Sequence, residues 1–357
     1  MVKHKNSVRF NSQTAVNLAF LVLFSLCIYV PFFFSTYDLI FKSVNQAAQP
    51  ITQNQQESSY EKYITSPGSG LIYTKELIGL GNSLKIKYLG VHQINDVVIG
   101  QQGWLYVDQN NSMKDFMGLA PYSDEALLNF RNVLEYRKNL LARAGVPMLL
   151  VVAPNKETIY PEYLPKAIKR VNNQTRLDQF VSYFNTNTDI PILDLRETLR
   201  RARTEYPVYY MTDSHWNTLG AFIASSAIMS EFKTRFPNLP LHTLSDYKIT
   251  INTIPSGSDL PALLFMKGMF QEQNVVLEPI NPKISPFRRI PYAVVYHDSF
   301  YQDIEPWLTP YFGKVNDFWV TQGDPSFDGA FITREQPTIV IYLMVERFVD
   351  KFFNSYP

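Results

Sequence analysis

Cysteine is almost absent from this chain, and neither sign of charge is in excess. The single cysteine, Cys27, excludes an internal disulfide and any metal site built from several cysteines. The 33 lysines and arginines against 32 aspartates and glutamates leave a formal net charge of +1, so no overall field draws the chain to nucleic acid. A hydrophobic content of 46% is too rich for disorder and sufficient for a real core.

The N-terminus carries basic residues followed by a long uncharged run. Residues 1–14 include Lys3, Lys5 and Arg9, and residues 15–35 contain no charged side chain. A helical run of about 20 residues spans the roughly 30 Å of a bilayer core. The basic flank predicts that residues 1–14 stay in the cytoplasm and that the rest of the chain is translocated. We expect an uncleaved, single-pass inner-membrane anchor, with a cleaved signal peptide as the alternative.

Two further changes in composition predict the domain organisation. Residues 36–70 are rich in Gln, Asn, Ser and Thr, which is typical of a linker. Residues 71–357 are expected to form one folded domain, without internal repeats. Ser123 is predicted to cap a helix that ends at Gly145. The apolar run Pro147–Pro154 that follows is typical of a strand buried on both faces of a parallel sheet.

Helices and strands continue to alternate, which predicts an α/β fold. Further strands are expected at 190–195, 208–211, 292–296, 318–320 and 338–343, and further helices at 175–184, up to residue 203, and at 219–236. Five or six parallel strands favour a three-layer α/β domain with a mostly parallel sheet over a barrel. Residues 237–289 contain seven prolines and are interpreted as an excursion with short strands rather than a separate domain.

Three reactive side chains follow predicted strands directly. Asp213 and His215 come after the strand at 208–211 and lie two residues apart, so in an extended segment they project to the same side. Ser299 follows the strand at 292–296 and precedes a helix that begins near Tyr301, where backbone amides can stabilise an oxyanion. A hydroxyl, an imidazole base and a carboxylate that orients the base are what nucleophilic catalysis requires.

Each of these residues also has a purely structural interpretation. Asp213 is typical of a turn, and His215 would then be a hydrogen-bonded core histidine packed by Trp216. Ser299 would be a helix N-cap, which is an ordinary role for serine.

A metal site is the other chemical alternative. Asp213, His215, His297 and Asp298 carry imidazole and carboxylate ligands. It is less favoured, because no third histidine lies in a tight motif. We expect neither a metal nor a cofactor.

Several segments resemble the AlgJ/AlgX family of alginate O-acetyltransferases, which have an SGNH hydrolase-like catalytic domain. Asp213–Ala221 resembles the Asp-x-His-Trp segment of that family, and His297–Phe300 is similar to its serine motif. Gly103–Tyr106 resembles an early signature of the family. Pro154–Pro161 and Gly257–Leu260 resemble further landmarks in the expected order.

The resemblance runs from about Val97 to Arg347 and implies a function. It implies a catalytic triad of Asp213, His215 and Ser299 in a domain on the periplasmic side of the membrane. Such enzymes take an acetyl group delivered by a partner membrane acyltransferase of the MBOAT class and place it on an exopolysaccharide hydroxyl.

Other functions fit the same residues. Water in place of sugar would make the protein a carbohydrate esterase, and a silent site would make it a scaffold of a polysaccharide export complex. Trp216 and Tyr301 are candidates for sugar stacking and Asn155 for the oxyanion hole, each with a packing or turn role as the alternative. His297 stands where related motifs have glycine, and it either narrows the site or points away.

Overall fold

The computed structural model describes Ser25, residues 74–281 and residues 290–353. The chain divides into two compact units, Met1–Gly81 and Asn82–Pro357. The predicted tail, anchor and linker lie outside the described residues, apart from Ser25. None of the helices in the described ranges has the length and apolar content needed to cross a bilayer.

The centre of the second unit is a five-stranded sheet in which every neighbouring pair is parallel. Its strands, in spatial order, are β5 (Ile192–Asp194), β4 (Met148–Ala153), β10 (Ile339–Val345), β8 (Ile290–His297) and β9 (Phe312–Trp319). The last strand in the sequence therefore occupies the middle of the sheet. The predicted α/β class with a parallel sheet is confirmed.

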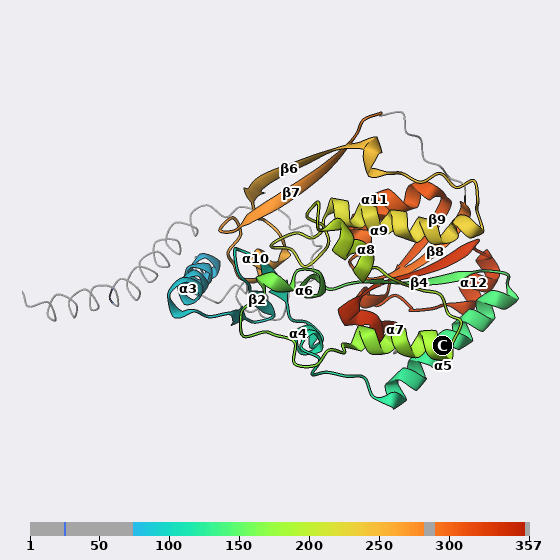
Figure 1. The fold of residues 1–357 in the computed structure, drawn as a ribbon, viewed down its shortest axis with the longest axis horizontal. Coiled ribbons are helices and arrows are strands. Elements are labelled where there is room, and N and C mark those ends of the chain that lie inside the picture. The colour runs from blue at the N-terminus through green and yellow to red at the C-terminus, as the bar shows by residue number, and fades with distance from the viewer. Residues whose placement is uncertain (1–24, 26–73, 282–289, 354–357) are drawn as a thin grey trace, which may run out of the picture. The chain divides into compact units, whose positions relative to one another are not determined.

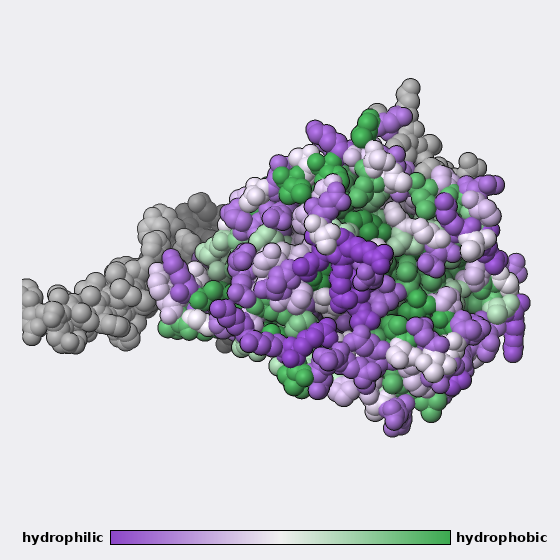
Figure 2. Space-filling view, in the orientation of Figure 1, coloured by the Kyte–Doolittle hydropathy of each residue, from purple (hydrophilic) through white to green (hydrophobic). Residues whose placement is uncertain are grey.

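Helices cover both faces of the sheet, which gives three layers (Figure 1). On one face lie α5 (Asp124–Arg143) and α7 (Arg176–Asn187). On the other lie α8 (Arg196–Ala202), α9 (Thr218–Glu231) and α11 (Tyr301–Leu308). Figure 2 shows a strongly hydrophilic patch on the surface over α8, a helix with several exposed charged side chains.

Two hydrophobic cores separate these layers, because alternate residues of each strand point to opposite faces. In β4, Leu149 and Val151 belong to the core beneath α9 and α11. Leu150 and Val152 belong to the core beneath α5 and α7. All six residues of β4 are buried, at about 1.5–3 kcal/mol of stabilisation for each large apolar side chain. The sheet is thus held rigidly from both sides.

Apart from one helix of 16 residues, the remaining elements are short. They are α3 (Thr74–Leu89), β1 (Gln93–Ile94), β2 (Val97–Ile99), β3 (Leu105–Val107), α4 (Ser112–Phe116), α6 (Lys156–Ile159), α10 (Asp259–Leu263) and α12 (Gly329–Glu335), with 3₁₀ turns at Pro161–Tyr163, Phe232–Thr234, Leu244–Asp246, Thr309–Tyr311, Val320–Gln322 and Glu346–Phe353. Strands β1, β2 and β3 form a small antiparallel sheet.

The proline-rich excursion contains a long hairpin rather than short strands. β6 (Tyr247–Pro255) and β7 (Gln271–Pro279) pair antiparallel over their full nine residues. Figure 1 shows this hairpin beside α9 and apart from the main sheet. Its prolines stand at the strand ends, where no ladder hydrogen bond is lost.

The strand predicted at 208–211 does not form. Tyr209 makes only an isolated antiparallel bridge with Trp216. The N–H of Asn217 donates to the carbonyl of Val208 at 3.1 Å, so the chain folds back on itself within a few residues. The segment is a tight loop beside the sheet.

Candidate active site

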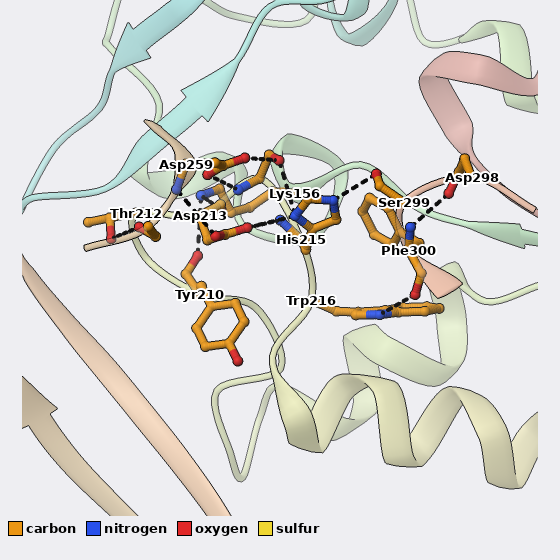
Figure 3. A network of polar contacts seen from close by, with 12 residues as sticks. Lys156, Tyr210, Thr212, Asp213, His215, Trp216, Asp259, Asp298, Ser299 and Phe300 are labelled. Carbon is orange, nitrogen blue, oxygen red and sulfur yellow. Dashed lines mark hydrogen bonds and ion pairs between the residues drawn. The ribbon is translucent and has the colours of Figure 1, made fainter. Parts of the chain in front are cut away.

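Ser299 lies in the turn between β8 and α11 and points to a histidine from another part of the chain. Its Oγ is 2.8 Å from Nε2 of His215, across 84 positions of sequence. The N-cap residue of α11 is Phe300, which makes no side-chain cap, so the capping role considered for Ser299 is excluded. Figure 3 shows the two side chains facing each other.

His215 is oriented from its other side by Asp213. Nδ1 of His215 lies 2.7 Å from Oδ1 of Asp213, and the same oxygen accepts the backbone N–H of His215 at 3.1 Å. An ionised carboxylate only accepts hydrogen bonds, so the proton on Nδ1 is fixed. Nε2 is therefore the lone-pair nitrogen and accepts the proton of the Ser299 hydroxyl.

Electrostatics within this pair favour the charged form of both groups. Burial lowers the pKa of His215, but the hydrogen bond to Asp213 and the charge of Asp213 outweigh it and hold that pKa above its ordinary value. Burial raises the pKa of Asp213, and the hydrogen bonds and charge of His215 outweigh that effect and lower it. Asp213 thus stays ionised and makes His215 a stronger base.

A buried lysine holds the loop that carries the pair. Lys156, at the start of α6, is 2% exposed, and its Nζ donates to the carbonyl oxygens of Tyr210, Met211 and Asp213 at 3.2, 3.1 and 2.6 Å. These three bonds join the loop to the end of β4. Burial lowers the pKa of Lys156 to about 8, so it remains mostly protonated at neutral pH.

Two further carboxylates hold the loop from the opposite side. Asp259 of α10 accepts the backbone N–H of Ser214 at 3.0 Å and also the Ser214 hydroxyl. Glu272 of β7 accepts the N–H groups of Met211 and Thr212 at 2.8 and 2.9 Å. The loop is thus fixed at nearly every residue, which preorganises the histidine.

The turn that carries Ser299 is fixed as firmly. Asp298 is fully buried, and its two oxygens accept the N–H of Phe300 at 2.9 Å and the N–H of Val345 at 2.6 Å. Trp216 donates from Nε1 to the carbonyl of Phe300 at 3.1 Å. The backbone N–H of Ser299 donates to no residue that the structure describes, and it is available to an oxyanion.

A pocket of about 450 Å³ opens beside the Asp213–His215 pair. Its walls come from the histidine loop, α11, the hairpin and the segment before α10. The lining residues are Tyr210, Asp213, His215, Ile254, Pro255, Ser256, Gly257, Ser258, Asp259, Glu272, Asn274, Gln302 and Asp303. The reactive pair therefore faces a space large enough for a sugar residue.

The family described as "SGNH hydrolase-like domain, acetyltransferase AlgX" matches residues 97–273. This match confirms the resemblance to the AlgX/AlgJ family of SGNH hydrolase-like acetyltransferases over that range. The matched range contains Asp213 and His215 and ends before Ser299.

Curated members of the AlgX/AlgJ family match about half of the chain or less. The "Probable alginate O-acetylase AlgJ" of Pseudomonas putida is 29% identical over 186 residues, 52% of this chain and 46% of that protein. The protein of the same name from Pseudomonas aeruginosa is 29% identical over 138 residues, 38% of this chain and 33% of that protein. The chain thus matches less than half the length of these relatives.

Solved structures show more distant likenesses. The O-acetyltransferase domain of Pseudomonas putida AlgJ has a TM-score of 0.48 and 19% identity, over 73% of this chain and 93% of that one. Bacillus cereus PatB1 with a sulfonyl adduct has a TM-score of 0.49 and 16% identity, over 74% of this chain and 97% of that one. Both scores lie below 0.5, so the α/β assignment rests on the sheet itself.

Three further residues predicted for the site are buried. Trp216 is fully buried and packs against Phe300, and Tyr301 is 3% exposed and stacks on His297 at 4.2 Å between ring centroids. Neither ring presents a face to a sugar, so the predicted stacking role is wrong for both. Asn155 is 2% exposed, and its Oδ1 accepts from Arg347 at 3.2 Å. No hydrogen bond joins Asn155 to the reactive residues in the described ranges.

The alternative metal site does not assemble. His297 points away from the pocket, with Nε2 3.1 Å from Asp317, and both oxygens of Asp298 bind backbone amides. Asp213, His215 and Asp259 do offer ligand atoms within 4.8 Å of one another. A metal there would have to displace the hydrogen bonds that occupy both ring nitrogens of His215.

The sequence did not predict the residues that hold the Asp213–His215 pair in place. Lys156 and Asp259 lie in Pro154–Pro161 and Gly257–Leu260, the segments that resemble family landmarks but had no assigned role. The structure brings both segments to the histidine loop.

Proposed function

We propose that this chain is an O-acetyltransferase that moves an acetyl group onto a polysaccharide hydroxyl through an acyl-serine intermediate. The observation that carries the proposal is the unbroken chain of hydrogen bonds from Asp213 through His215 to Ser299, beside a pocket. The match to the AlgX/AlgJ family supports the acetyl group and a polysaccharide acceptor.

The reaction proceeds in two displacements. His215 takes the proton of the Ser299 hydroxyl, and Oγ attacks the carbonyl carbon of the acetyl donor. The Ser299 amide stabilises the oxyanion, the bond to the leaving group breaks, and His215 returns the proton to that group. An acceptor hydroxyl then gives its proton to His215 and attacks the acetyl-serine. This forms the new ester, and Ser299 regains a proton from His215.

We further propose that residues 15–35 anchor the chain in the inner membrane and that the catalytic domain lies in the periplasm. An MBOAT-class membrane acyltransferase would then supply the acetyl group. Support comes from the uncharged run and its basic flank. A periplasm-dependent reporter such as alkaline phosphatase, fused after residue 353, is expected to be active, whereas an inactive fusion would contradict this orientation.

The test of the reaction is Ser299→Ala. Glycan acetate in cells that carry this variant is expected to fall to the level of a deletion strain, while the protein still accumulates. The matched control is Ser182→Ala, which changes an exposed serine of α7 and should leave acetylation unchanged. Normal acetylation in the Ser299→Ala strain would refute the proposal.

The two alternatives have distinct outcomes. An esterase would hydrolyse a chromogenic acetate ester at a rate that added sugar does not change. A scaffold would not label at Ser299 with a serine-reactive sulfonyl fluoride. The scaffold interpretation expects Ser299 and His215 to lie too far apart for a hydrogen bond. The 2.8 Å between Oγ of Ser299 and Nε2 of His215 does not favour it.

A further inference from the structure

The walls of the pocket are acidic. Asp213, Asp259, Glu272 and Asp303 line it, and no lysine or arginine is among its lining residues. A charged wall selects among ligands by their charge, because the low-dielectric surroundings focus the field within a cleft.

Three of these four carboxylates are already engaged by the protein. Asp213 accepts from His215, and Asp259 accepts from Ser214. Glu272 accepts three backbone amides and the hydroxyl of Thr212. Most of their hydrogen bonds are made to the histidine loop and are not available to a ligand.

Asp303 differs from the other three. It lies in the first turn of α11, four residues after Ser299, and it has no hydrogen bond or ion pair with any residue in the described ranges. Burial raises the pKa of Asp303 to about 6, with the charge of Asp213 adding to the rise and His215 opposing it. Above that pH it is an ionised, half-buried acceptor on the pocket wall, open to a hydrogen bond from a ligand.

Nearby cations do not cancel the charge of the wall. Lys156 and Arg347 both lie close enough to act on the pair, but both are buried. Lys156 is bound to three carbonyl oxygens, and Arg347 donates to Asn155 and lies 5.5 Å from the ring of Phe300. Neither cation lines the pocket, so the groups that a ligand in the pocket meets include four carboxylates and neither lysine nor arginine.

We propose that Asp303 determines acceptor specificity by accepting a hydrogen bond from an acceptor hydroxyl, and that the acceptor sugar at this site is uncharged. Gln302 and Asn274 line the same pocket and offer amide groups to neighbouring hydroxyls. A uronate residue would bring its own carboxylate against Asp303 and be repelled. This inference rests on the proposed function, which it narrows from polysaccharides in general to neutral ones.

The experiment compares two acceptors that differ at one carbon. The purified full chain is given a chromogenic acetate ester and either a β-1,4-linked mannose hexamer or a β-1,4-linked mannuronate hexamer, at pH 7.5 and low salt. Acetylated hexamer is measured by mass spectrometry. We expect transfer to the neutral hexamer to be about tenfold faster, and the preference to shrink as salt is added.

Two variants assign the preference to one side chain. Asp303→Asn keeps the shape and removes the charge, so the preference should fall to about twofold. Glu305→Gln makes the same change on the exposed side of α11 and should leave it at the wild-type value. Equal or faster transfer to the uronate, or an unchanged preference in Asp303→Asn, would overturn the inference.

A binding measurement separates this inference from the proposed function. Each hexamer is tested for protection of Ser299 against a sulfonyl fluoride. If neither hexamer is acetylated but the neutral one protects Ser299 about tenfold better, transfer is refuted and the specificity stands. If neither protects, or the uronate protects better, the specificity is refuted whatever the chemistry.

Discussion

Replacing Lys156 by methionine tests whether a buried charge holds the histidine loop in place. The substitution keeps an unbranched side chain of similar length and removes the ammonium group. The carbonyl oxygens of Tyr210 and Asp213 then lose their donor, whereas that of Met211 keeps the N–H of Leu105 at 2.9 Å. The loop that carries His215 would still be held by Asp259, Glu272 and this backbone bond.

The magnitude follows from two opposing contributions. A buried carbonyl that loses its donor costs about 1–3 kcal/mol, so two cost about 4 kcal/mol. Burial lowers the pKa of Lys156 from 10.5 to about 8, a difference of 2.5 (10.5 − 8). Keeping the ammonium group buried therefore costs about 3 kcal/mol, which methionine does not incur. We expect the free energy of unfolding to fall by about 1 kcal/mol at pH 7.

This effect depends on pH in a direction that tests the reasoning. Because the pKa of Lys156 is lower in the folded chain, the unfolded chain binds more protons between pH 8 and pH 10.5. Wild-type stability therefore gains from this group as the pH rises through that window, and the methionine variant does not. The difference in unfolding free energy should grow by about 2 kcal/mol from pH 7 to pH 9.5.

The assay is urea unfolding of the purified full chain, followed by tryptophan fluorescence at both pH values. Lys166→Met is the control, because Lys166 is exposed and no pH-dependent difference is expected from it. A difference between wild type and Lys156→Met that stays constant or shrinks at pH 9.5 would refute the buried-charge account.

Three other predictions, two substitutions and one pH dependence, concern the triad and its surroundings. Asp213→Asn should lower the rate of acetyl ester hydrolysis by about 10³–10⁴-fold, because an amide no longer fixes the proton on Nδ1 of His215; a loss under tenfold would count against the triad. The acid limb of the wild-type rate should lie above pH 6.5, because the pKa of His215 is raised and only the neutral ring is a base. A limb below pH 6 would contradict that direction. Gly220→Ala should destabilise the chain by about 3 kcal/mol or more, since a Cβ there would lie 2.1 Å from the carbonyl oxygen of Val208. The measurement is the melting temperature of each variant. Gly81→Ala is the control, because a Cβ at Gly81 would meet no atom within 4 Å.

Local signals in the sequence predicted several helices and strands of the α/β domain correctly. Ser123 accepts the N–H of Ala126 as the predicted cap of α5, and Pro147–Pro154 contains β4. Asn217 caps α9 by accepting the N–H groups of Leu219 and Gly220. Each of these features is decided within a few residues, where propensity and periodicity act.

The features that the sequence did not predict depend on contacts between residues far apart in the chain or on how the loop folds. The 208–211 segment is apolar enough for a strand, but it folds back onto Trp216, so pairing within the loop replaced pairing with the sheet. Lys156 reaches carbonyls up to 57 positions away, and no periodicity encodes such a contact. Trp216 follows His215 directly and Tyr301 lies two positions after Ser299, yet both side chains are buried in the core.

The strand order of the sheet bears on when the protein becomes able to react. β10 follows the other four strands of the five-stranded sheet in the sequence, and it lies between β4 and β8, so neither half of the sheet is complete without it. The amide of Val345, the last residue of β10, also holds the carboxylate of Asp298 beside the nucleophile. A chain that is still being synthesised therefore has its histidine and serine but no framework that brings them together. The proposed acyl transfer therefore requires β10, a strand that is synthesised after both reactive residues.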